Sequence, residues 1–168
     1  MTGNLPGQPP AMPRRVYTSW SARVAAFFVD MVPLGLAWGI WEVVALRSAT
    51  LDCVTFDNGG VSCSSGISSV GYLAFALTVA VSVAYLVWNY GHRQGVSGSS
   101  VGKSVLRFQV LDEKTWRPVG FGASVLRQAV HLLDAAVCFI GFLFPLWDRR
   151  RQTLADKLTG TVCVPKRY

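Results

Sequence analysis

Charged residues are scarce in this sequence of 168 residues, where only 15% are Asp, Glu, Lys or Arg. Acidic residues are the rarer kind, with 9 against 16 basic residues, and there are only two histidines. By contrast, 51% of the residues are hydrophobic and the mean hydropathy is +0.36. The apolar residues form long runs instead of the helix or strand periodicities of a soluble core. This composition is typical of a membrane protein of one domain.

Motifs of catalysis and of nucleotide binding are also missing. The sequences HExxH and GxSxG do not occur, and no cysteine stands beside His92 or His131. We therefore expect no enzyme, no cofactor and no metal site. Residues 95–104 approach a phosphate-binding loop, but Ser97 stands where the first glycine is needed, and an apolar helix precedes them instead of a buried strand. We therefore expect no nucleotide.

The apolar run at residues 23–46 is long enough to cross a bilayer, which takes roughly 20 mostly apolar residues. Asp30 lies inside this run, seven residues after Arg23 and so on the same helical face. A carboxylate near mid-helix costs roughly 2.5–3.5 kcal/mol on insertion scales, so its presence needs an explanation. Pro33, three residues later, predicts a kink. Arg23 and Asp30 are therefore a candidate ion or coupling site.

Residues 70–90 contain no charged side chain over 21 positions, which predicts a second spanning helix. The polar residues of this helix recur at i, i+4, i+7 and i+11, so they form one stripe. If the helix returns antiparallel to the first, Ser82 and Tyr85 lie level with Asp30. We expect these two hydroxyls to donate to Asp30, with simple packing as the alternative role of the stripe.

A third apolar segment, residues 124–147, is interrupted by polar residues. Arg127, His131 and Asp134 are spaced i, i+4, i+7 and form a polar stripe, a candidate support for the site, and we expect His131 to pair with Asp134. Only thirteen apolar residues follow before Asp148, roughly 20 Å of helix against a hydrocarbon core of about 30 Å. We expect a re-entrant or interfacial segment, with a third spanning helix as the alternative.

The distribution of basic residues predicts the orientation, because Lys and Arg accumulate on the cytoplasmic side. If the third segment does not cross, 15 of the 16 basic residues lie on one side, and Arg47 alone lies on the other. Both termini are then cytoplasmic. A basic face beside anionic lipid, worth roughly 1 kcal/mol per residue, accounts for the net charge of +7. The bilayer is therefore the expected partner, and nucleic acid is not.

The outer loop between the two helices contains Cys53 and Cys63. Cys138 falls in the third apolar segment and Cys163 on the reducing side of the membrane. Cys53 and Cys63 are then the pair that shares an oxidising space, which predicts a disulfide between them. Two free thiols are the alternative.

The remaining segments are short. Residues 1–18 are rich in Pro and Gly and predict a disordered cytoplasmic tail. Residues 105–112 and 161–164 are strand candidates, which together predict a small cytoplasmic β element. The spacing of Thr153 and Asp156 matches a helix capping box.

These observations predict an all-α membrane protein with two transmembrane helices, a third re-entrant or spanning segment, and a small cytoplasmic β element. The expected parts are a tail at 1–18 and a membrane domain at 19–165, made of a helix at 23–46, an outer loop at 47–69, a helix at 70–90, a cytoplasmic loop at 91–123, the third segment at 124–147 and a cytoplasmic C-terminal segment at 148–168.

Three short motifs follow one another along the chain. Their residues are Arg23, Ala26 and Asp30 in R-x-x-A-x-x-x-D; Gly98, Gly102 and Lys103 in G-x-T-x-G-K, with Ser100 in place of threonine; and Arg150, Arg151, Thr153, Leu154, Asp156, Gly160 and Thr161 in R-R-x-T-L-x-D-x-x-x-G-T. In this combination and order, the chain resembles the RDD family of bacterial membrane proteins over residues 17–165. That family is named for one arginine and two aspartates.

The resemblance implies that Arg23, Asp30 and Asp156 are the signature residues, and that the protein is a multi-pass protein of the bacterial plasma membrane. Transport has been proposed for the family, and some members look like cation/proton antiporters. Two functions therefore stay open. One is an accessory subunit that binds lipid or a partner membrane complex, or forms a homo-oligomer. The other is an oligomeric transporter or antiporter that uses Asp30 with Arg23, because two or three helices cannot enclose a path alone.

Overall fold

The computed structural model describes residues 12–136 and 140–166, without the side chains of 132–136. The side chain of Asp134 and all of Cys138 therefore lie outside the described residues. The chain divides into two compact units, Asp30–Leu86 and Met1–Val29 together with Val87–Tyr168. We call the first the hairpin unit and the second the basic unit, because the second holds 15 of the 16 Lys and Arg.

Two helices are long and apolar enough to cross a membrane, among the described residues. Helix α1 spans Trp20–Arg47 and continues through Pro33, while α2 spans Ser69–Leu86 and runs on into the π-helix η2, Val87–Arg93. In the most apolar 18-residue stretch of each helix, only 11% of the residues are buried. The apolar side chains therefore face outward, as they do in contact with lipid. The two apolar helices expected at 23–46 and 70–90 are therefore present, each slightly longer than expected.

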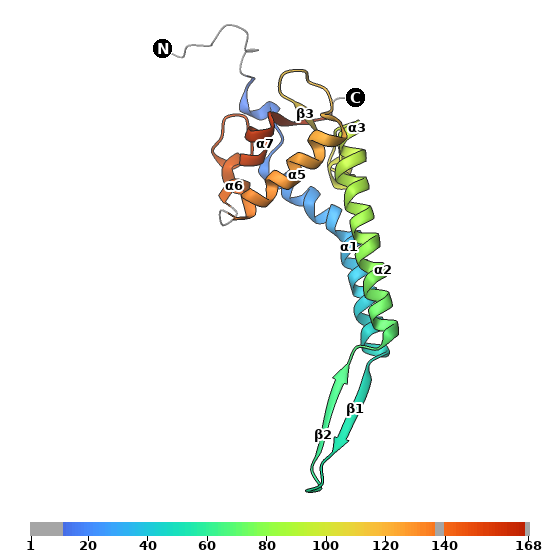
Figure 1. Ribbon diagram of the computed structural model, residues 1–168. Helices are drawn as coiled ribbons and strands as arrows, with labels where there is room; N and C mark the ends of the chain where they lie inside the picture. The colour runs from blue at the N-terminus through green and yellow to red at the C-terminus, as the bar shows by residue number, and fades with distance from the viewer. Residues whose placement is uncertain (1–11, 137–139, 167–168) are drawn as a thin grey trace. The chain divides into compact units, whose positions relative to one another are not determined.

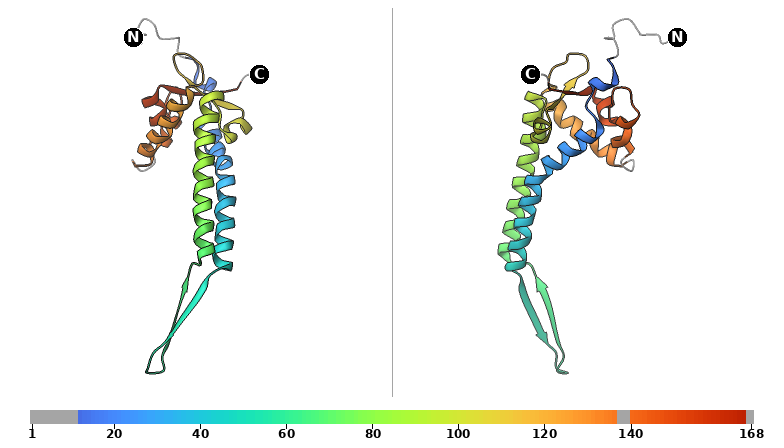
Figure 2. Two further views of the ribbon diagram at one scale, coloured as in Figure 1. Left: turned by 45° about the vertical axis from the view of Figure 1, so that its right-hand side comes forward. Right: turned by 180° about the vertical axis from the view of Figure 1, so that it is seen from behind.

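Within the hairpin unit, α1 and α2 lie side by side (Figures 1 and 2). Trp38 packs edge-on against Trp41 and Phe75, and Trp41 and Phe75 pack at a tilt, with all three pairs of ring centroids 5.4–5.9 Å apart. The indole N–H of Trp41 also donates to the carbonyl of Gly71 at 3.3 Å. A Cβ at Gly71 would lie 2.6 Å from a methyl group of Ile67, so a larger residue here would require the Ile67 side chain to move.

The segment between α1 and α2 forms a β-hairpin, whereas the sequence analysis treated it as a loop. Strand β1, Thr50–Thr55, pairs antiparallel with β2, Val61–Gly66, and Cys53 lies directly opposite Cys63. A disulfide joins the two cysteines, as predicted. Every residue of both strands is exposed, and a lone two-stranded hairpin is marginal in water. The disulfide supplies the constraint that packing does not.

The basic unit consists of short elements. They are η1 Arg14–Val16, η2 Val87–Arg93, α3 Gln94–Ser97, α4 Val101–Val105, β3 Phe108–Asp112, α5 Gly120–Ala136, α6 Ile140–Leu143, η3 Phe144–Leu146, α7 Leu154–Thr159 and β4 Thr161–Pro165, together with the first ten residues of α1. Strands β3 and β4 form an antiparallel pair with Val110 opposite Cys163. This pair confirms the small β element expected from the sequence.

The core of the basic unit lies against this strand pair. Tyr17 packs with Leu111, Val162 and Val164, and the backbone N–H of Thr18 donates to the carbonyl of Cys163 at 2.9 Å. Residues 1–11 of the expected disordered tail lie outside the described residues. Its last residues are ordered, because Tyr17 is only 5% exposed and so is a core residue.

Helix α5 buries two polar residues and exposes several apolar ones among its described side chains. Ser124 and Arg127 are buried, whereas Phe121, Val125 and Leu126 are 50%, 41% and 59% exposed. The third apolar segment is thus divided among α5, α6 and η3, and the described residues contain no third helix long and apolar enough to span. A spanning third segment is not confirmed.

Candidate functional site

The candidate site is built on the N-terminus of α7. Thr153 is the N-cap, and its hydroxyl accepts the backbone N–H of Asp156 at 3.0 Å. In return, the Thr153 N–H donates to Oδ2 of Asp156 at 3.1 Å. This reciprocal pair is the capping box expected from the sequence, and it fixes the Asp156 carboxylate at the start of the helix.

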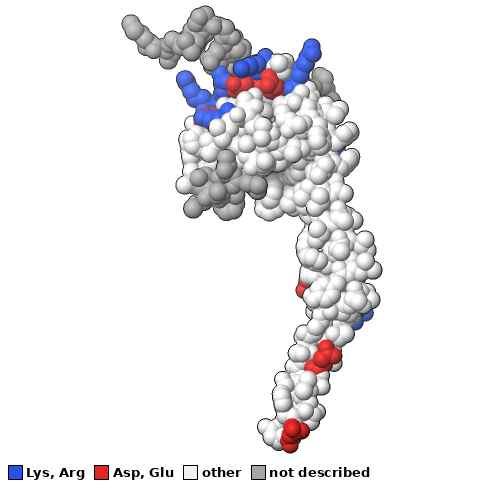
Figure 3. Space-filling model, viewed as in Figure 1, with Lys and Arg blue, Asp and Glu red and all other residues white. Residues whose placement is uncertain are grey.

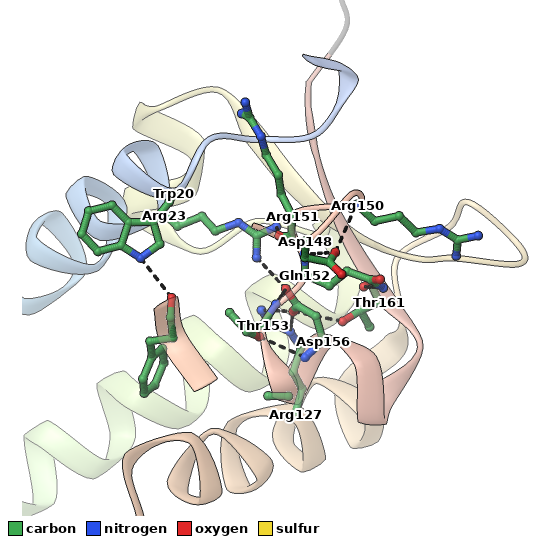
Figure 4. Close-up of polar contacts among 12 residues, drawn as sticks. Trp20, Arg23, Arg127, Asp148, Arg150, Arg151, Gln152, Thr153, Asp156 and Thr161 are labelled. Atoms are coloured by element: carbon green, nitrogen blue, oxygen red, sulfur yellow. Dashed lines mark hydrogen bonds and ion pairs between the residues drawn. The ribbon is translucent and has the colours of Figure 1, made fainter. Parts of the chain in front are cut away.

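Two arginines from distant parts of the chain meet at this carboxylate (Figure 4). Asp156 is completely buried, and Nη1 of Arg23 lies 2.5 Å from its Oδ2. Arg127 of α5 donates to Oδ1 through Nε at 2.9 Å and Nη2 at 2.6 Å. The hydroxyl of Thr161 in β4 adds a donor at 3.3 Å. The cluster therefore ties α1, α5, α7 and β4 together.

The electrostatics of the cluster keep Asp156 ionised. Burial alone raises the pKa of the Asp156 carboxyl, but the positive charges of Arg127 and Arg23 outweigh burial, so the pKa lies far below its usual value. One anion faces two cations, and five donors satisfy its two oxygens. A carboxylate held in this way does not exchange protons near neutral pH, so the geometry suits a structural clamp.

The backbone around Arg151 supports the clamp. Nη2 of Arg23 donates to the Arg151 carbonyl, and Nη1 of Arg151 donates to the Tyr17 carbonyl at 3.2 Å. Arg151 adopts a left-handed conformation with φ of 50°, which is uncommon for residues other than glycine. The carbonyl of Arg151 accepts the hydrogen bond from Arg23, and the strained backbone at this residue indicates that the surrounding contacts hold it in place.

Of the predicted stripe on the third segment, Arg127 reaches the clamp and His131 lies beside it. The His131 ring stacks on Phe142, with centroids 5.2 Å apart and planes 10° apart. Burial, followed by the charge of Arg127, lowers the pKa of His131 to about 3, so the imidazole is neutral at physiological pH.

Asp30 belongs to the hairpin unit, and its side chain is completely buried. The hydroxyl of Tyr85 reaches Asp30 and donates to its backbone carbonyl at 3.1 Å. Ser82 is also buried, but its hydroxyl has no hydrogen-bond partner among the described residues. The carboxylate that pairs with Arg23 is Asp156, whereas the sequence analysis grouped Arg23 with Asp30.

A second polar network surrounds Lys103, and the sequence analysis missed most of it. Lys103 Nζ donates to Oε1 of the completely buried Gln94 at 2.7 Å, and the Gln94 amide donates to the Ser124 hydroxyl at 2.9 Å. The only signal in the sequence was the glycine-rich G-x-S-x-G-K motif. A Cβ at Gly102 would lie 2.0 Å from the carbonyl oxygen of Ala26. Gly102 and Ala26, which belong to two different motifs, therefore allow α4 to pack closely against α1.

Two long helices expose apolar side chains suited to lipid, and a buried Arg–Asp–Arg cluster holds the basic unit together. These features define a membrane protein with a folded basic unit. The comparisons agree with this class. Residues 17–160 match the RDD family, and the chain belongs to that family, as the motifs indicated.

The curated relatives are mycobacterial. The chain is 52% identical over 158 residues to a "Proline-rich antigen homolog" of Mycobacterium tuberculosis (strain ATCC 25618 / H37Rv), covering 92% of this chain and 65% of that protein. It is 46% identical over 158 residues to the "Proline-rich antigen" of Mycobacterium leprae (strain TN), covering 92% and 64%. The chain thus spans a little under two thirds of the length of these relatives. No solved structure matches the chain.

Proposed function

We propose that this protein is a non-transporting accessory protein of the bacterial plasma membrane, whose basic unit binds the anionic cytoplasmic face of the bilayer. The observation that supports the proposal is the exposed apolar surface of the basic unit, which lies over buried polar residues. Helix α5 buries Arg127 and exposes Phe121 and Leu126, and the exposed apolar residues continue through α6 and η3. A soluble unit does not expose such a surface, whereas one that lies in the membrane interface does.

The charges of the two units support this orientation. The basic unit contains 15 basic and five acidic residues, a net charge of +10, and the hairpin unit contains one basic and four acidic residues, a net charge of −3. Figure 3 shows Lys and Arg side chains gathered at one end of the basic unit, above a surface with few charges. Because basic residues accumulate in the cytoplasm, this asymmetry favours a cytoplasmic basic unit and an outer hairpin.

The clamp favours an accessory role over transport. Asp156 and its two arginines are satisfied by each other, and the low pKa of Asp156 removes it as a proton carrier near neutral pH. The cluster is therefore suited to holding the basic unit in one shape for binding.

The test of the proposal is fluorescence quenching of Trp147 in proteoliposomes by lipids with brominated acyl chains. The Trp147 signal is the difference between the wild type and Trp147→Phe. If the basic unit binds the bilayer surface, Trp147 is quenched strongly in vesicles of brominated phosphatidylglycerol and less in brominated phosphatidylcholine. An unquenched Trp147 in both would refute the proposal.

Transport is the second candidate, and the burial of Asp30 in a spanning helix favours it. Ionisable groups at membrane depth are functional candidates by default, and Pro33 interrupts the helical hydrogen bonds one turn later. Two spanning helices cannot enclose a path, so transport requires an oligomer. Proton-coupled cation flux into liposomes that contain the purified protein tests this candidate. Flux that Asp30→Asn abolishes, and that Asp57→Asn leaves intact, would overturn the accessory role.

A further inference from the structure

We propose that a hollow on the basic unit binds the headgroup of an anionic phospholipid that carries hydroxyl groups, such as phosphatidylglycerol. The hollow has a volume of about 390 Å³. It is lined by Glu113, Asp148, Arg149, Arg150, Gln152 and Lys157. The inference rests on the proposed function, because it requires the basic unit to lie at the bilayer surface, and it names the ligand bound there.

The lining matches the charge of such a headgroup. Three cations and two carboxylates give it a net charge of +1, which complements the single negative charge of a phosphodiester. The carboxylates of Glu113 and Asp148 are hydrogen-bond acceptors, and hydroxyls of a glycerol or inositol headgroup are matching donors. A choline headgroup offers no such donor.

Two ion pairs lie in the hollow, and they leave Arg149 and Arg150 available to a phosphate. Lys157 lies 2.7 Å from Asp148, with side chains 40% and 13% exposed, and contributes its charge from within that pair. Arg150 lies 3.2 Å from Glu113, and both side chains are about one third exposed at 34% and 30%. Pairs this exposed contribute little, so Arg150 can share its donors with a phosphate. Arg149 is exposed and has no partner among the residues that the structure describes, so its guanidinium is open to a bidentate phosphate contact.

An exposed apolar segment directly precedes the lining residue Asp148 in the chain, and acyl chains could lie along it. Ile140, Leu143, Leu146 and Trp147 are exposed by 54%, 37%, 47% and 58% immediately before the charged residues begin at Asp148. Tryptophan is enriched at the level of lipid headgroups, where its ring has an apolar and a polar side. The order of apolar residues, tryptophan and arginines thus follows the layers of one bilayer leaflet.

This segment is held in place before any lipid binds. The indole N–H of Trp20 donates to the Phe142 carbonyl at 3.0 Å, and Arg14 donates to the Pro145 carbonyl at 3.3 Å. Lys157 lies 4.8 Å from the centre of the Phe144 ring. Anchoring from both sides reduces the entropy lost when a lipid binds.

Native mass spectrometry of the full chain, released from detergent with added phosphatidylglycerol or phosphatidylcholine, measures the affinity directly. The test variant is Arg149→Gln/Arg150→Gln/Lys157→Gln. The matched control is Arg15→Gln/Lys114→Gln/Arg117→Gln, which removes the same charge from exposed side chains outside the hollow. We expect the test variant to lose about tenfold in affinity for phosphatidylglycerol and the control about twofold or less, with phosphatidylcholine about tenfold weaker on the wild type.

Three results would overturn the inference: equal losses in the two triple variants, equal binding of the two lipids, or displacement of phosphatidylglycerol by inorganic phosphate at equal concentration. If the triple test variant does not fold, Arg149→Gln alone, which breaks no described contact, must still weaken binding about threefold. If only the headgroup site is wrong, Trp147 is still quenched by brominated lipid. If the proposed function is wrong, Trp147 is not quenched at all.

Discussion

Replacing Asp156 with asparagine tests whether the Arg–Asp–Arg cluster holds the basic unit together. The change is nearly isosteric and leaves an acceptor for the capping box, but it removes the carboxylate that bridges Arg23 and Arg127. Arg127 and Arg23 are 5% and 12% exposed, so water screens little of their repulsion. Breaking a buried pair in this way costs about 3–5 kcal/mol.

The coupling within the cluster gives a sharper measurement than the single change. Arg127→Gln removes two of the five hydrogen bonds to Asp156 and leaves the carboxylate with Arg23. The double variant keeps the net charge of the wild-type cluster and no longer sets two cations against each other, although Arg23 stays without a carboxylate. We expect the double variant to lose at least 1 kcal/mol less free energy of unfolding than the sum of the single losses, since contacting residues couple by about 0.5–3 kcal/mol.

The assay is equilibrium unfolding of the purified protein in mixed micelles, followed by tryptophan fluorescence. Asp57→Asn, an exposed carboxylate in the hairpin turn, is the matched control and is expected to change the free energy of unfolding by less than about 0.5 kcal/mol. A loss for Asp156→Asn no larger than that of Asp57→Asn, or strict additivity with Arg127→Gln, would refute the clamp.

Three further predictions concern the pH response, the α1–α4 contact and the hairpin. His131 has a pKa of about 3 when folded and 6.5 when unfolded, so the unfolded state binds more protons between these pH values, and stability falls as pH drops below 6.5, by at most about 1.4 kcal/mol per pH unit. In His131→Gln, the midpoint temperature of unfolding should therefore depend less on pH in this range. An unchanged pH dependence would contradict the prediction. Gly102→Ala should lower the yield of folded protein, because its Cβ would lie 2.0 Å from a backbone carbonyl of α1, whereas Gly122→Ala, with open space around it, should not. The Cys53–Cys63 disulfide closes a short loop and stabilises the fold by about 3 kcal/mol. Its reduction should therefore speed amide exchange in the hairpin and not in the basic unit. Maleimide labelling of these cysteines in intact cells before reduction would show that no bridge forms.

Local patterns in the sequence determined the elements that depend on neighbouring residues. The charge-free run at 70–90 predicted a helix because lipid admits few other structures. The spacing of Thr153 and Asp156 predicted a capping box because its hydrogen bonds join residues three apart. Cys53 and Cys63 were paired by topology alone, and the structure joins them.

The sequence also assigned the residues of the RDD motifs, but it did not show how they are grouped. Arg23 and Asp30 are seven residues apart and share a helical face, so sequence spacing favoured their association. The structure pairs Arg23 with Asp156 instead, across 133 residues. No local periodicity reports a contact over that distance, because it depends on how α5, α7 and the start of α1 pack around β3 and β4.

Tertiary structure likewise decided the character of the third segment and of the first residues. The stripe of Arg127 and His131 was visible in the sequence, but only packing shows that α5 turns it inward and leaves Phe121 and Leu126 exposed. Tyr17 stands in a Pro- and Gly-rich stretch, yet the edge of β4 and a small apolar core hold it in place. The sequence by itself thus determined which residues are apolar enough for lipid and which carry charge, while the fold decided which charges meet, because burial and pairing are properties of segments brought together in space.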